Sequence, residues 1–136
     1  MRYFGYFLLL LVLPVSVQGR NLYFQPRLEV NPVGSTAWEV IESGGEGARG
    51  IWCAAADYVL RRNPNVRGRL YVLAPRGPAR TRPGAIGVTF TMSPDAEMKN
   101  FPGSYSVSVR AAGENLPVQH AYAFCDDYLY ELKEHF

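Results

Sequence analysis

The 136-residue sequence has few of the residues and motifs on which enzyme and metal sites depend. It contains two histidines and two cysteines, and these four residues lack the close spacing of metal ligands. It has no Gly-x-Ser-x-Gly nucleophile motif, no phosphate-binding glycine loop and no His-Glu-x-x-His zinc motif. These absences argue against the common hydrolase, nucleotide-binding and metalloprotease classes, and we expect no metal and no cofactor.

The sequence also has little net charge. Lysine and arginine exceed aspartate and glutamate by two, and the pI is about 8.6. A domain that binds nucleic acid usually has a pI above about 9, so we expect no nucleic-acid partner. With 48% apolar and 13% aromatic residues, the composition is that of a folded chain and not of a disordered one.

Long hydrophobic runs are missing except at the start of the chain. Arg2 precedes an apolar run over residues 4–13, and Val17, Gln18 and Gly19 resemble a signal-peptidase site. The run is shorter than the roughly 20 residues that span a bilayer, which disfavours the alternative of a membrane anchor. We therefore predict a signal peptide over residues 1–19, a periplasmic or secreted protein, and no membrane span after cleavage.

Residues 20–34 contain two prolines and no clear periodicity, which predicts an extended lead-in, and residues 35–136 are long enough for a single domain. Alternating apolar residues predict strands at 35–42, 69–73, 85–92 and 104–110, and helical spacing predicts helices at 50–62 and 115–136. This order, β-α-β-β-β-α, favours a two-layer α+β fold with two helices on one face of an antiparallel-rich sheet of about four strands. A β-rich barrel closed by a helix is the alternative.

The two cysteines lie on the apolar stripes of the two predicted helices. Cys125 is central on its stripe and Cys53 lies at the edge of the other, so both point toward the same layer. We predict a disulfide between them, as is common in small exported domains. Free thiols and a metal site that includes His120 and His135 are the alternatives. A Cys-His enzyme is disfavoured because His120 lies on the opposite side of its helix from Cys125.

The first of these helices carries the segment Trp52-Cys53-Ala54-Ala55-Ala56-Asp57-Tyr58. This segment resembles one found in small exported proteins of alphaproteobacteria that have no assigned function. The resemblance covers little more than the helix. It implies export and supplies no catalytic residues.

A run of arginines without any acidic residue between Asp57 and Asp95 is the clearest charge pattern in the chain. Guanidinium groups bind phosphate and carboxylate in a fork geometry, so the run is a candidate anion-binding region. The four arginines that we select as site residues are Arg69, Arg76, Arg80 and Arg82. The alternative is a solvated surface, with ion pairs to the acidic C-terminal residues Asp126, Asp127, Glu131 and Glu134.

These patterns favour a small non-enzymatic binding or inhibitor-like protein whose partner is an unidentified protein or anionic ligand. Two alternatives stay open. One is a small periplasmic hydrolase that uses an unidentified carboxylate or serine, for example a pair formed by Asp57 with Glu39 or Glu46. The other is an anion-binding module built on the arginines of residues 61–82.

Overall fold

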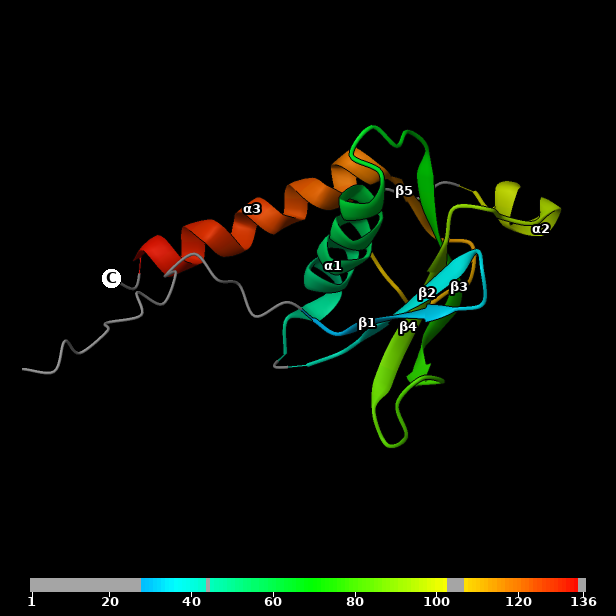
Figure 1. Cartoon of the computed structure of the whole chain (residues 1–136), viewed down its shortest axis with the longest axis horizontal. Coiled ribbons are helices and arrows are strands. Elements are labelled where there is room, and N and C mark those ends of the chain that lie inside the picture. Colours follow the sequence, from blue (N-terminus) through cyan, green and yellow to red (C-terminus); the bar gives the residue numbers. More distant parts are fainter. Residues whose placement is uncertain (1–27, 44, 103–106, 135–136) are drawn as a thin grey trace, which may run out of the picture.

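The computed structural model describes residues 28–43, 45–102 and 107–134, and Figure 1 shows their arrangement. The predicted signal peptide, residues 1–19, and residues 20–27 of the predicted lead-in lie outside this part of the chain. The described residues form a five-stranded antiparallel sheet and two long helices that pack against each other. The predicted α+β fold class is therefore confirmed, with one strand more than expected.

The strands of the sheet lie in the order β1-β2-β4-β3-β5, and every neighbouring pair is antiparallel. Strand β1 lies within the segment that the sequence indicates as an extended lead-in, and it contains Pro32, which a sheet tolerates at an edge. The bounds are Val30–Val33 (β1), Ala37–Ile41 (β2), Arg69–Pro78 (β3), Ile86–Thr91 (β4) and Asn115–Pro117 (β5).

The two long helices are α1, Gly47–Arg62, and α3, Val118–Glu134, and they lie side by side in Figure 1. Helix α1 begins three residues before its predicted start and ends at Arg62 as predicted. A short helix, α2 (Ala96–Lys99), begins where the Asp95 side chain accepts a hydrogen bond from the Met98 amide. Among the helices that the structure describes, none is long and apolar enough to cross a membrane.

The main core lies between the helices and one face of the sheet. Side chains of β2, β3 and β4 that alternate toward this face meet Trp52 of α1 and Ala121 of α3. Trp52 is fully buried, its ring packs edge-on against Phe90 with centroids 5.0 Å apart, and its indole Nε1 donates to the Val107 carbonyl at 2.8 Å. Trp52 is thus a core residue of the domain.

The strand predicted at residues 104–110 is wrong where it can be checked. Residues 107–109 have no regular secondary structure, and residues 104–106 lie outside the described part. The Val107 carbonyl binds the Trp52 indole, and the Val109 carbonyl accepts from the Arg76 amide at 2.9 Å. Each of these carbonyl groups makes an isolated hydrogen bond that is not part of a strand ladder, although the sequence alternates as in a strand.

The helix predicted from Asn115 begins instead at Val118. Leu116 pairs with Leu70 in the sheet, and the Val118 amide donates to the Gly68 carbonyl at 3.0 Å, so residues 115–117 form β5. The apolar stripe of this helix is confirmed at Val118, Ala121 and Cys125, which are buried, but Tyr122 is 42% exposed. Its predicted members beyond residue 127 lie outside the side chains that the structure describes.

Candidate functional site

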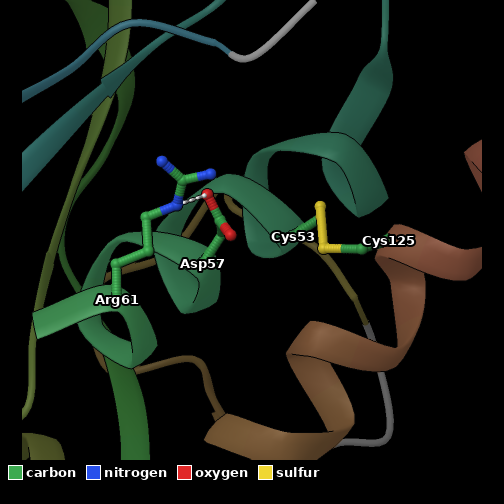
Figure 2. The surroundings of a disulfide bond; sticks show 4 residues. All are labelled: Cys53, Asp57, Arg61 and Cys125. Atoms are coloured by element: carbon green, nitrogen blue, oxygen red, sulfur yellow. Dashed lines mark ion pairs between the residues drawn. A yellow bond between two sulfur atoms is a disulfide. The ribbon is translucent and has the colours of Figure 1, made fainter. Parts of the chain in front are cut away.

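The two cysteines form the predicted disulfide. Cys53 of α1 is bonded to Cys125 of α3, with their Cα atoms 5.1 Å apart and a sequence separation of 72 (Figure 2). The bond clamps the two helices at a buried contact. Because each sulfur is bonded to the other, neither is a thiol nucleophile or a metal ligand in this structure.

The structure does not bring Asp57 together with either glutamate considered for hydrolysis: Glu46 is the N-cap of α1, roughly 16 Å along the helix from Asp57, and Glu39 lies elsewhere. Asp57 makes an ion pair with Arg61 one turn further along α1, at 2.9 Å (Figure 2). Glu39 lies on β2 and hydrogen-bonds to residues 80 and 81 on the other face of the sheet. His120 stacks at a tilt on Phe124, and within the described ranges no three potential metal-binding side chains cluster.

The best-defined polar site is a carboxylate that holds a loop. Glu39, only 2% exposed, accepts hydrogen bonds from the Arg80 amide at 2.8 Å, the Thr81 amide at 2.9 Å and the Thr81 hydroxyl at 2.6 Å. Burial alone would raise the pKa of the Glu39 carboxyl, but these hydrogen bonds outweigh it and hold the pKa below its usual value. Glu39 is thus an ionised anchor inside the fold.

The segment that Glu39 holds is residues 79–85, which we call the β3–β4 loop; it extends from the lower end of the sheet in Figure 1. The Thr81 hydroxyl also accepts from the Asn31 side-chain amide at 3.0 Å, and Arg82 pairs with Glu29 at 2.8 Å. The Ala79 amide closes the base of the loop by donating to the Ala85 carbonyl at 2.9 Å. Side chains before and within β1 and β2 therefore hold the loop, Glu39 through two backbone amides and the Thr81 hydroxyl, and Asn31 and Glu29 through side chains of the loop.

Gly87 of β4 makes room for the anchor. A methyl group in place of its α-hydrogen would lie 2.9 Å from the Glu39 carboxyl carbon and 3.0 Å from Cγ. We expect Gly87→Ala to lower the free energy of unfolding by about 2 kcal/mol, because the overpacked carboxylate must give up part of its hydrogen bonding. Urea unfolding of both proteins measures this. The control is Ala85→Ser, because Gly84 has a φ of +79° that disfavours any side chain. If Gly87→Ala lowers the free energy of unfolding by no more than Ala85→Ser does, the steric role of Gly87 is contradicted.

The four arginines selected from the sequence occupy three places. Arg69, at the start of β3, donates to the Asn115 side-chain oxygen at 2.7 Å, whereas Arg76 near the end of β3 pairs with Glu42 at 2.8 Å. Arg69 and Arg76 are seven positions apart along the strand, which separates them by roughly 20 Å, so they do not share one binding point. Arg80 and Arg82 lie together in the β3–β4 loop, where both are exposed.

A second feature is an open hollow of about 600 Å³ beside the N-terminal turn of α1. Its apolar floor is formed by Ala48, Ile51, Val107 and Val109, and its polar lining residues are Glu42, Arg76, Ser108 and Arg110. The hollow thus combines two guanidinium groups with one carboxylate, and that carboxylate already pairs with Arg76.

Among the residues that the structure describes, two carboxyl groups have raised pKa values. Burial raises the pKa of Glu46, and burial also raises that of Glu114, partly offset by hydrogen bonds from the Ser108 hydroxyl and the Arg110 amide. A general acid or base would have to face substrate. Neither Glu46 nor Glu114 is among the residues that line the hollow, so the hollow does not present a carboxyl group with a raised pKa.

The role of Glu39 and the hollow beside Arg110 were not predicted from the sequence. Glu39 stands between Trp38 and Val40 in an alternating strand, a pattern that predicts a solvated outer face. The sequence does contain both partners, this glutamate and a loop rich in proline and arginine. It does not indicate that they pair, because about 40 residues separate them.

Comparisons of the chain with protein-family models, with curated proteins and with solved structures find no match. The resemblance of the Trp52–Tyr58 segment to small exported proteins therefore stays a prediction, and the function must be argued from the site itself.

Proposed function

We propose that this protein is a small exported, non-enzymatic binding domain that uses the β3–β4 loop to contact an acidic surface on a partner protein. The observation that carries the proposal is the anchoring of the loop backbone by the buried Glu39 carboxylate. A loop that is held in one conformation before binding loses less entropy on association, which raises affinity. Inhibitor-like proteins depend on this property.

The charge of the loop indicates the kind of partner. Arg80, Arg82 and Pro83 are exposed, and no acidic residue occurs in sequence between Asp57 and Asp95. Arg82 pairs with the exposed Glu29 at 2.8 Å, and both loop guanidinium groups lie at the surface, where a carboxylate of a partner can contact them. Arginine is enriched in binding hot spots and pairs with carboxylates through two parallel hydrogen bonds, which favours an acidic protein surface.

The disulfide and the predicted signal peptide both support an extracytoplasmic compartment. The Cys53–Cys125 bond is consistent with an oxidising extracytoplasmic environment. Residues 1–19 have the composition of an export signal, so we place the mature protein in the periplasm or outside the cell.

The experiment is affinity capture from periplasmic and culture-supernatant extracts over a range of salt concentrations, followed by titration of the captured protein. We expect Arg80→Ala/Arg82→Ala to weaken binding roughly tenfold. The matched control is Arg61→Ala/Arg62→Ala, which removes the same charge from α1, where Arg61 pairs with Asp57 and Arg62 stacks over Tyr58. Equal weakening by both double variants, or no retained protein at any salt concentration, would contradict the proposal.

A further inference from the structure

We infer that the hollow beside α1 binds a small organic anion, namely a carboxylate that carries a short apolar chain. This inference goes beyond the proposed function, because it concerns a different surface from the β3–β4 loop. It depends on the shape, the lining and the charge of the hollow.

The size and lining of the hollow suit a small amphipathic ligand. Its volume of about 600 Å³ falls within the usual range for ligand sites, roughly 300 to 1,000 Å³. Ile51 and Val109 are almost fully buried and form its apolar floor, whereas Arg76 and Arg110 are exposed. A ligand could therefore place an apolar chain against the floor while its charged group stays near the guanidinium groups.

The charge of the hollow selects an anion. Arg76 and Arg110 give two positive charges, and Glu42 gives one negative charge that is already paired with Arg76 at 2.8 Å. The Arg110 amide donates to the Ser108 hydroxyl, which in turn hydrogen-bonds to Glu114, and these bonds fix the backbone that carries Arg110. The net positive charge beside an apolar floor favours a carboxylate head group over a cationic or neutral one.

The first turn of α1 adds to this preference. Gly47 and Ala48 line the hollow, and the first turn that follows the N-cap Glu46 contains no acidic residue. The backbone amides of this turn place the positive end of the helix dipole beside the hollow. This effect supports the two arginines, which supply the main attraction.

Octanoate is the probe, with octylamine as a control for charge and acetate as a control for the apolar chain. We expect saturable binding of octanoate at millimolar concentrations or below, measured by NMR titration, with shifts centred on the methyl groups of Ile51 and Val109. Octylamine and acetate should bind at least about fivefold more weakly, since an ion pair or a few buried methylene groups each contribute a factor of that order.

Substitutions of the residues that line the hollow distinguish a specific site from nonspecific binding. Arg110→Gln should weaken octanoate binding about fivefold, whereas Glu42→Gln should strengthen it severalfold because it releases Arg76 from its ion pair. Arg62→Gln, on α1 outside the hollow, and Arg80→Ala/Arg82→Ala in the loop should leave the affinity unchanged. Absence of saturable binding, equal affinity for octylamine, or weaker binding by Glu42→Gln would overturn the inference.

Discussion

Replacing Cys53 and Cys125 together with alanine should lower the free energy of unfolding by about 4 kcal/mol. The disulfide closes a loop of 72 residues, and a cross-link of that span removes much of the conformational entropy of the unfolded chain. Alanine suits both sites because Cys125 is buried and Cys53 is half-buried. Denaturant unfolding, compared at pH 7 for both proteins, measures the loss.

Reduction provides the control for this prediction. The unsubstituted protein in excess reductant should fall to the stability of the double variant, whereas the variant itself should not respond to reductant. Mass spectrometry after alkylation in denaturant checks the bond itself. Alkylation of both thiols without prior reduction, or a stability loss below about 1 kcal/mol, would contradict the role of the disulfide as the clamp between α1 and α3.

Replacing Glu39 with glutamine should lower the free energy of unfolding by about 3 kcal/mol. The carboxylate accepts three hydrogen bonds in a site that is 2% exposed, and glutamine keeps the shape but turns one acceptor oxygen into a donor NH₂ group. That group must face an N–H or O–H of the loop. Glu29→Gln is the control, because Glu29 is about half exposed and its carboxylate contacts exposed groups, pairing with Arg82 and accepting from the Asn31 side-chain amide, so its loss should stay below about 1 kcal/mol.

The same pair of proteins tests the ionisation of Glu39. A carboxyl group whose pKa is lower in the folded state stabilises the fold above its unfolded-state pKa of about 4.5, and this contribution is lost as the pH falls through the lower folded-state value. The stability difference between the unsubstituted protein and Glu39→Gln should therefore be full at pH 6 to 7 and shrink below pH 4.5. A difference that is constant down to pH 3 would contradict an ionised anchor.

Helical periodicity predicted the parts of the structure that local sequence determines. The apolar spacing of residues 50–62 and of residues 115–136 predicted both helices, although the second begins at Val118, and the positions of Cys53 and Cys125 on their stripes were enough to predict the disulfide. The strong alternation around Trp38 and around Phe90 likewise predicted β2 and β4. Each of these helices and strands buries one continuous face, and burial of one face is what a periodic apolar pattern indicates.

The remaining elements depend on partners that are distant in sequence. Strand β1 exists because Val30 and Val33 pair with Val40 and Ala37, and β5 exists because Leu116 pairs with Leu70. Both strands are too short for a clear pattern of their own. Residues 107–109 have the alternating pattern of a strand but do not form one. The Val107 carbonyl accepts from the Trp52 indole, and the Val109 carbonyl accepts a single hydrogen bond from β3.

The candidate site was predicted only in outline. The arginine run indicated a cationic surface, but it could not show that Arg69 and Arg76 lie at opposite ends of β3 or that Arg110 joins Arg76 at the hollow. The alternation of β2 predicts that Glu39 faces solvent, and the sequence could not show that the β3–β4 loop covers it. The positions of Arg110 beside Arg76 and of Glu39 beneath the loop depend on tertiary contacts between segments about 30 to 40 residues apart.

The claim that Glu39 holds the β3–β4 loop in its binding conformation is tested most directly by amide hydrogen exchange at Arg80 and Thr81. We expect both amides to exchange slowly in the unsubstituted protein and markedly faster in Glu39→Gln, under conditions where both proteins are fully folded. Equal exchange rates in the two proteins, or fast exchange at Arg80 and Thr81 in the unsubstituted protein, would show that the carboxylate does not hold the loop.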